Sequence, residues 1–236
     1  MPTIILATGN PHKVKELRAI FGAADGGAAA WRIIGLGDLP GGPFTEPVEH
    51  GTTFEENARI KALSYATQIG DPHVFCLGDD SGIVIDALRL PDGPPRPGVI
   101  SSHYSSDGRE TGISREARDA ANNARVLREL ANIPEEKRTA RFVCCMCLAR
   151  AERAGESWKH AILHETRGTM EGRIGTPPRV PSGGNGFGYD PLFLVSPSFA
   201  KTGSELPSEE KNRLSHRGMA AGRMFHWARE HLAATN

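Results

Sequence analysis

A short apolar run that ends abruptly in a turn constrains the fold of this chain more than any other feature. Residues 3–7 read TIILA, and Thr8, Gly9 and Asn10 interrupt the run before a helical pattern begins. Asn10 is a preferred helix N-cap and Pro11 a preferred first helical residue. The sequence therefore predicts a buried strand that passes through a tight turn straight into a helix, a unit typical of sheets covered by helices.

Strand and helix patterns continue to alternate along the 236 residues, which favours an α/β fold over an all-helical or sandwich fold. A chain of this length can form one large domain, or one domain divided into two lobes about a cleft, so we expect a single domain over residues 1–236. The further predicted strands are residues 31–36, 74–77, 83–88, 141–149, 158–166 and 191–195. One predicted helix starts at residue 11, and two more cover residues 53–68 and 114–132. A helical pattern is also present from residue 208 onward.

Charge and composition exclude several classes of function. Lys and Arg together number 28, as do Asp and Glu, so we expect no broad basic surface for nucleic acid or for a membrane. No run approaches the roughly 20 apolar residues that a membrane span needs, and we expect no leader before the first strand. Three of the four cysteines crowd into residues 144–147, which is not the spacing of a secreted disulfide framework. We expect a soluble protein of the reducing cytoplasm.

The turn at residues 8–13 is a candidate phosphate site. The N-terminus of a helix offers free backbone N–H groups and the positive end of its dipole, and Lys13 adds a full charge within the first turn. The spacing GxxxxGK[ST] of a Walker A loop is absent. An ordinary corner with a solvated lysine explains the same residues equally well.

Glu49, Asp79 and Asp80 are candidate ligands for a hard metal ion. The two aspartates stand in the segment GDDSG between apolar runs, which predicts a turn bounded by glycines. Mg²⁺ takes oxygen ligands, usually through one or two carboxylates plus substrate phosphates. We favour a metal site over a plain polar turn, because α/β folds bind their ligands at strand ends.

The spacing of Cys144, Cys147, His160 and His164 points to a different chemistry, since it satisfies C-x2-C-x12-H-x3-H, the pattern of a zinc finger. A zinc-dependent nucleic-acid-binding module is therefore an alternative function. The flanking residues form one apolar strand, however, and alternation along it places the two cysteines on opposite faces. We interpret the cysteines as small core residues.

Two further segments carry candidate nucleotide-binding side chains. Residues 183–190, GGNGFGYD, do not fit a dinucleotide fingerprint, but glycines flanking aromatic residues suit a loop that lays a ring against a flat base. On one helix, Lys211 and Ser215 would face the same way, with His216 and Arg217 just beyond. A flexible connector and a solvated basic helix end are the plainer explanations.

Taken together, six segments resemble the inosine triphosphate pyrophosphatase family, enzymes that remove non-canonical purine nucleoside triphosphates. The segments occur in the family's order and read TGNPHK, FEENARIKA, GDDSGIVIDAL, PGVISSHYS, GFGYDPLF and SEEKNRLSHRG. The resemblance implies a mixed central β-sheet flanked by helices, with two lobes around a deep active-site cleft. It also implies a Mg²⁺ requirement, a homodimer, and hydrolysis of ITP, dITP and XTP to the monophosphate and pyrophosphate.

The resemblance implies roles for individual residues as well. Asp80 would be the general base and, with Glu49, would bind the metal, beside Ser81. Lys13 would hold the leaving pyrophosphate. The residues expected to hold the triphosphate are Thr8, Gly9, Asn10, Pro11, His12 and Lys13. The residues expected to handle the rest of the nucleotide are Phe187, Gly188, Tyr189, Asp190, Lys211, His216 and Arg217.

Two departures from the family pattern concern the edge of the expected cleft. The proline-rich loop at residues 90–97 is longer than usual, and His103 stands where the family normally has arginine. A pyrophosphatase for pyrimidine or modified nucleotides would share the phosphate chemistry and is a second alternative. For purines, His216 and Arg217 are donors that suit the 6-oxo group of ITP and XTP and would face the 6-amino group of adenine donor to donor.

Overall fold

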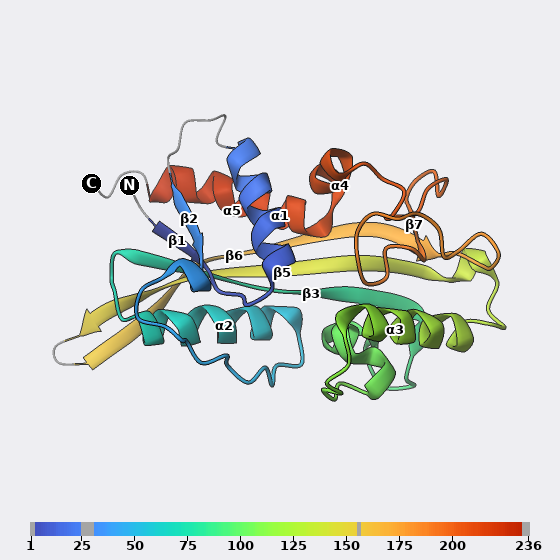
Figure 1. Ribbon diagram of the computed structural model, residues 1–236, viewed down its shortest axis with the longest axis horizontal. Helices are drawn as coiled ribbons and strands as arrows, with labels where there is room; N and C mark the ends of the chain where they lie inside the picture. The colour runs from blue at the N-terminus through green and yellow to red at the C-terminus, as the bar shows by residue number, and fades with distance from the viewer. Residues whose placement is uncertain (1–2, 25–30, 155–156, 233–236) are drawn as a thin grey trace. The chain divides into compact units, whose positions relative to one another are not determined.

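The computed structural model describes residues 3–24, 31–154 and 157–232, and it contains a mixed β-sheet flanked by helices (Figure 1). The strands are β1 (Thr3–Leu6), β2 (Arg32–Gly35), β3 (Val74–Arg89), β4 (Pro95–Pro97), β5 (Thr139–Ala154), β6 (Ser157–Ile174) and β7 (Phe193–Val195). The α-helices are α1 (Pro11–Ala24), α2 (Phe54–Ile69), α3 (Arg115–Glu129), α4 (Ser208–Leu214) and α5 (His216–His231). The 3-10 helices are η1 (Leu36–Asp38), η2 (Gly98–Ser106) and η3 (Glu135–Lys137). The predicted α/β class is confirmed.

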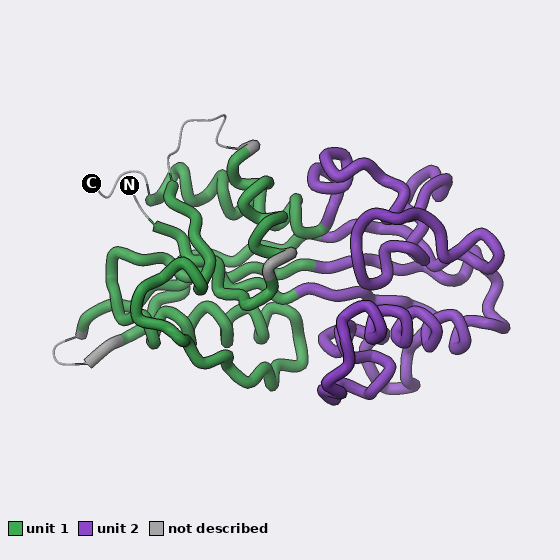
Figure 2. Tube along the Cα trace, viewed as in Figure 1, with its two compact units in different colours: residues 1–80, 144–168, 216–236 green, residues 81–143, 169–215 purple. Residues whose placement is uncertain are grey.

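The chain divides into two compact units, which Figure 2 draws in different colours. Unit 1 comprises residues 1–80, 144–168 and 216–236, and unit 2 comprises residues 81–143 and 169–215. Three of the four divisions fall within β3, β5 and β6, so each of these strands gives residues to both units, and the fourth falls between Ser215 and His216. A single domain over the whole chain and a cleft between lobes stay predictions.

The sheet is mixed because its strands pair in both directions. Its order is β2-β1-β3-β5-β6-β7, and β4 pairs with β3. β1 runs parallel to β2 and to β3, whereas β3 and β4 are antiparallel, as are β6 and β7. The parallel register pairs Leu6 with Leu77, so β1 ends two residues before the partner strand reaches Asp79. This register brings the turn after β1 to the acidic segment of β3.

Within unit 1, helices cover both faces of the sheet, which explains the unbroken apolar run of β1. Ile4 and Leu6 pack with α1 and α5, where Phe21 and Phe225 meet edge to face with ring centroids 6.0 Å apart. Ile5, between them, points to the opposite face and packs with α2. Figure 1 shows α1 and α5 on one side of these strands and α2 on the other. Successive residues of each strand therefore serve different helices.

Local signals set the starts of α1, α2 and α3 as predicted. Asn10 Oδ1 accepts a hydrogen bond from the backbone N–H of Lys13 at 3.4 Å, so Asn10 caps α1. Thr53 caps α2, because its side chain accepts from the N–H of Glu56 while the Glu56 carboxylate accepts from the N–H of Thr53. Ser114 caps α3 through its side chain alone, which accepts from the N–H of Ala117. None of the helices described is long and apolar enough to cross a membrane.

Two sequence predictions about element boundaries are wrong. The segment at residues 78–82 is not a turn between two strands, because β3 runs unbroken through it. The placement of Ser215 on one helix face with Lys211 is wrong as well. Ser215 is extended, with φ −69° and ψ 153°, and separates α4 from α5. Lys211 therefore belongs to unit 2, and His216 and Arg217 to unit 1.

Candidate active site

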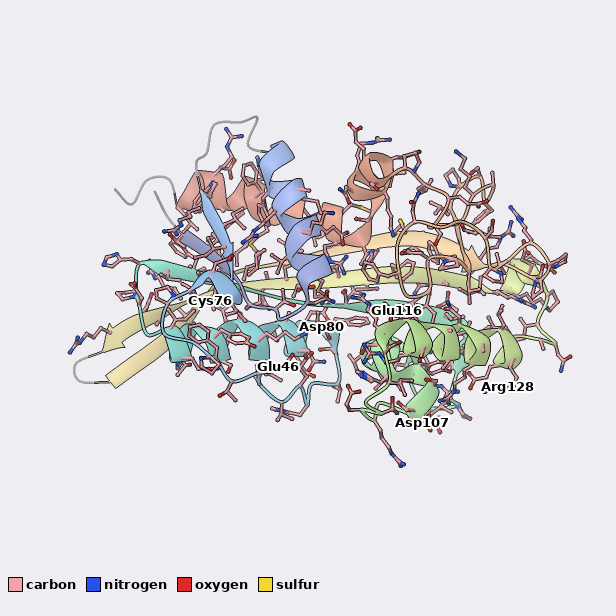
Figure 3. The ribbon with its side chains drawn as sticks, viewed as in Figure 1. Glu46, Cys76, Asp80, Asp107, Glu116 and Arg128 are labelled. Atoms are coloured by element: carbon pink, nitrogen blue, oxygen red, sulfur yellow. The ribbon has the colours of Figure 1, made fainter. Side chains whose placement is uncertain are left out.

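The acidic segment of β3 divides its two carboxylates between the two faces of the sheet in unit 1. Asp79 follows Phe75 and Leu77 at odd positions, so it points to the side of α1 and α5. Asp80 follows Cys76 and points to the side of α2, where Figure 3 labels it on its strand. The adjacent acids thus have different neighbours, although no sequence pattern distinguishes them.

Asp79 is an anion enclosed by cations. It is 1% exposed, its Oδ2 lies 2.8 Å from Lys13 Nζ, and Arg217 Nε lies 4.0 Å away. Burial by itself would raise the pKa of Asp79, but Lys13, Arg217 and Lys61 outweigh burial and lower the pKa to about 2. Arg217 is 3% exposed and also pairs with Glu16 of α1 at 2.6 Å. Asp79 therefore fixes Lys13 beside the start of α1.

Asp80 meets two side chains of α2 that lie one turn apart. Its Oδ2 accepts from Asn57 Nδ2 at 3.1 Å, and its Oδ1 lies 3.6 Å from Lys61 Nζ. Burial raises the pKa of Asp80 above its ordinary value; Lys61 and Lys13 oppose this shift, and Glu49 adds to it. Asn57 Oδ1 also accepts from the N–H of Gly51 at 2.8 Å. The side-chain amide of Asn57 therefore connects the loop that carries Glu49 to Asp80, the candidate general base.

The contact of Asp80 with Asn57 and Lys61 of α2 depends on the absence of a side chain at Gly78. A Cβ there would stand 2.4 Å from the carbonyl oxygen of Ala58 and 2.6 Å from the backbone nitrogen of Ala62. Both atoms belong to α2, so only glycine lets the helix pack this closely on β3. The close approach sets the distance at which Asn57 and Lys61 reach Asp80.

Glu49 and Asp80 approach one cation, the ammonium group of Lys61. Lys61 Nζ lies 2.7 Å from Glu49 Oε2 and donates to the backbone carbonyl of Asp79 at 3.1 Å. Burial would lower the pKa of Lys61, but Asp80, Asp79 and Glu49 together raise it. The oxygens around this ammonium are of the kind that hard cations prefer, so the expected ligands fit Mg²⁺.

The same pair of carboxylates limits what the protein alone could offer to a metal. Among the residues that the structure describes, no three His, Cys, Asp or Glu side chains form a group able to hold a metal ion. Glu49 and Asp80 would therefore share the ion with phosphate oxygens or water, as is usual for Mg²⁺.

The four residues with zinc-finger spacing do not come together in the structure. Cys144 and Cys147 are fully buried in β5, and burial raises the pKa of each thiol to about 12. His160 Nε2 lies 2.5 Å from the hydroxyl of Thr67. The ring of His164 stacks on Trp227, with centroids 4.5 Å apart. The cysteines are core residues, as interpreted from the sequence.

Unit 2 holds the second group of expected nucleotide-binding residues. Asp190 Oδ2 accepts from the N–H of Phe187 at 2.9 Å and pairs with Lys211 Nζ at 2.5 Å. Lys211 Nζ also lies 5.6 Å from the centroid of the Phe187 ring. Tyr189 is 4% exposed, and its hydroxyl donates to the carbonyl of Ser101 at 2.7 Å. The aromatic loop is therefore fixed within its own unit before any ligand binds.

The structure thus brings the expected site residues together in two groups. Unit 1 contains Thr8, Gly9, Asn10, Pro11, His12, Lys13, Glu49, Asp80, His216 and Arg217, and unit 2 contains Ser81, Phe187, Gly188, Tyr189, Asp190 and Lys211. Thr8 Oγ1 accepts from the N–H of Asn10 at 3.2 Å, which shapes the turn. The side chains of Pro11 and His12 lie outside the described part. The roles of all these residues stay predictions.

Sequence reasoning missed Asn57, Lys61 and Glu16 as members of the site. A signal for the first two was present, since Asn57 and Lys61 stand four residues apart and share one face of α2. Their spacing alone could not say that this face meets Asp80. Glu16 carried no signal, because its partner Arg217 lies 201 residues away in the sequence.

Comparison with known proteins gives one consistent result. The model of the Ham1 family matches residues 4–227. A dITP/XTP pyrophosphatase of Exiguobacterium sibiricum is 43% identical over 217 residues, covering 92% of this chain and 92% of that protein. One of Halalkalibacterium halodurans is 42% identical over 224 residues, covering 94% and 97%. The solved structure of a HAM1 protein from Coxiella burnetii is similar with a TM-score of 0.73 and 35% identity, covering 98% of this chain and 100% of that one.

Proposed function

The chain belongs to the Ham1 family, and we propose that it hydrolyses non-canonical purine nucleoside triphosphates such as ITP, dITP and XTP to the monophosphate and pyrophosphate. Its relatives named dITP/XTP pyrophosphatase match it over more than nine-tenths of its length. The activity removes these nucleotides from the precursor pool. The enzyme is a hydrolase of acid anhydrides.

The observation that carries this proposal is the convergence of Glu49 and Asp80 on one cation beside the turn after β1. Lys61 Nζ lies 2.7 Å from Glu49 and 3.6 Å from Asp80, so the two carboxylates can share a positive charge. We take Glu49 and Asp80 as the residues that would hold Mg²⁺. When bound, the ion supplies charge neutralisation to the phosphates and acidity to a nearby water.

The residues of this chain would then divide the chemistry as follows. Asp80 accepts the proton of the water that attacks the α-phosphorus, and Asn57 holds its carboxylate in place. Lys13 and the N-terminus of α1 hold the leaving pyrophosphate, because both offer positive charge to an anion. Asp79 aims Lys13 through their 2.8 Å ion pair. Positioning and charge neutralisation supply most of the acceleration in such transfers.

The purine would be handled by the remaining residues. Phe187 would stack on the base, which adds affinity for any purine without choosing among them. His216 and Arg217 would donate to the 6-oxo group of ITP and XTP. The 6-amino group of adenine would leave such donors unpaired, at a cost of about 1–3 kcal/mol each.

Two measurements test the proposal. We expect kcat/KM with Mg²⁺ to be much higher for ITP and XTP than for ATP and GTP, and comparable values for ITP and ATP would refute the purine assignment. A preference for pyrimidine or modified triphosphates would favour the alternative pyrophosphatase. Reaction in ¹⁸O water should place the label mainly in the monophosphate. Label only in pyrophosphate would mean attack at the β-phosphorus, and release of orthophosphate would mean a different enzyme.

Three further properties rest on the family resemblance. We propose that the protein requires Mg²⁺, forms a homodimer and works in the cytoplasm. Activity titrated with Mg²⁺ after chelation tests the first, and light scattering on the purified protein tests the second. Full activity in excess EDTA, or a monomeric mass at micromolar concentration, would contradict the corresponding proposal.

A further inference from the structure

The aromatic loop of unit 2, residues 183–190, contacts a row of polar side chains from α3. Arg115, Asp119 and Asn123 are spaced by four residues, so they lie on one face of the helix on successive turns. None of the three belongs to the segments that resemble the pyrophosphatase family. All three nevertheless contact the loop at Phe187 and Gly188.

Gly188 is held at both of its backbone polar groups. Its N–H donates to Asp119 Oδ2 at 2.9 Å, and its carbonyl accepts from Asn123 Nδ2 at 3.0 Å. Gly188 has φ +63°, in the left-handed region that side chains disfavour. Two hydrogen bonds from consecutive helical turns therefore select one conformation of a residue that could adopt many.

The first member of the row acts on the ring next to Gly188. The guanidinium carbon of Arg115 lies 4.5 Å from the centroid of Phe187. Arg115 Nε also lies 3.8 Å from Asp119 Oδ2, so the same carboxylate contacts both the guanidinium and the glycine. The orientation of Phe187 and the conformation of Gly188 thus depend on one helix face.

Asn123 does more than fill space, because its amide donates to the carbonyl of Gly188 at 3.0 Å. Its Oδ1 is buried and has no hydrogen-bond partner among the described residues. A buried unpaired oxygen costs stability, so a residue that served packing alone would be better apolar. The adjacent Asn122 supports the same loop by another route, because its Nδ2 donates to the carbonyl of Ser101, which also accepts from Tyr189.

We propose that Asp119 and Asn123 are positioning residues for the nucleobase, acting through Gly188 to hold Phe187 in place for stacking. This inference rests on the proposed function, since it takes Phe187 as the surface that receives the purine. The two residues act on affinity for the base end of the substrate. In the proposed function Lys13 and the N-terminus of α1 serve the phosphate end, and the contacts to Gly188 come from Asp119 and Asn123 instead.

The experiment compares Asp119→Ala, Asp119→Asn and Asn123→Ala with the parent enzyme. Each alanine variant removes one hydrogen bond to Gly188, which corresponds to about a threefold to tenfold loss of affinity. We expect this loss in IMP binding by calorimetry and as a rise in the KM for ITP, with kcat and inhibition by pyrophosphate changed less than about twofold. Asp119→Asn keeps an acceptor oxygen and should restore most of the affinity. Arg128→Ala, at the exposed end of the same helix (Figure 3), is the control and should match the parent.

The outcomes separate this inference from the proposed function. If the parent hydrolyses ITP but both alanine variants bind IMP as the parent does, the positioning role is wrong and the proposed function stands. If IMP and pyrophosphate binding weaken equally, the row merely stabilises the fold, and the inference also fails. If the parent neither hydrolyses ITP nor binds IMP, the proposed function falls and the inference falls with it.

Discussion

Removing the charge of each of the two adjacent aspartates of β3 should affect the stability of the protein differently. Asp79→Asn removes the carboxylate that pairs with Lys13 at 2.8 Å and lies 4.0 Å from Arg217. Asp80→Asn does not remove all the oxygen partners of Lys61, because its Nζ still lies 2.7 Å from Glu49 and 3.1 Å from the carbonyl of Asp79. We therefore expect Asp79→Asn to destabilise the protein and Asp80→Asn to leave its stability nearly unchanged or slightly higher.

The size of the first effect follows from the burial of the pair. Removing one partner of a buried ion pair costs about 3–5 kcal/mol. The Lys13 side chain is 14% exposed, and the amide introduced by Asp79→Asn would still offer an oxygen, so the cost should fall to about 2–4 kcal/mol. For a chain of this size that corresponds to a loss of roughly 4–16 °C in Tm. Asp80→Asn should shift Tm by less than about 2 °C, in line with an effect within about 0.5 kcal/mol.

Urea and thermal unfolding followed by circular dichroism at pH 7, without Mg²⁺, measure both variants against the parent. The activity assay with ITP is run in parallel. Asp80→Asn should lose about 10²–10⁴-fold in kcat/KM while remaining folded, as expected on removal of a general base. Equal Tm values for the two variants would refute the division of the carboxylates between the faces of β3. Loss of activity in Asp80→Asn through unfolding alone would return Asp80 to a structural role.

Three further predictions test other parts of the structure. Gly78→Ala should cost about 1–3 kcal/mol in urea unfolding, because its Cβ would meet the backbone of α2 at 2.4 Å, whereas Gly37→Ala has open space and serves as the control. Tyr104→Phe should cost about 1–2 kcal/mol, because the buried hydroxyl donates to Glu129; an unchanged unfolding midpoint would contradict that bond. Protein purified without added metal should contain no stoichiometric zinc by mass spectrometry and should stay folded in EDTA; zinc bound at Cys144 would reverse this interpretation.

Local signals in the sequence were sufficient for the starts of α1, α2 and α3 and for the fold class. Thr53 with Glu56, and Asn10 with Lys13, sit within one helical turn of each other, so their hydrogen bonds depend little on the rest of the fold. The same local reasoning failed at residues 78–82. Glycine, aspartate and serine favour turns, but β3 continues through them because the buried charges find partners on α1, α2 and α5.

The sequence by itself determined which residues could do the chemistry: a lysine at a helix start, two adjacent acids, and an aromatic loop between glycines. Only the tertiary structure decided that Asp79 pairs with Lys13, whereas Asp80 contacts Lys61 and accepts a hydrogen bond from Asn57. The physical reason is that consecutive residues of a strand point to opposite faces, and each face is covered by different helices. A buried charge is stabilised by whatever reaches it across that face, and those partners lie far away along the chain, where no local pattern can identify them.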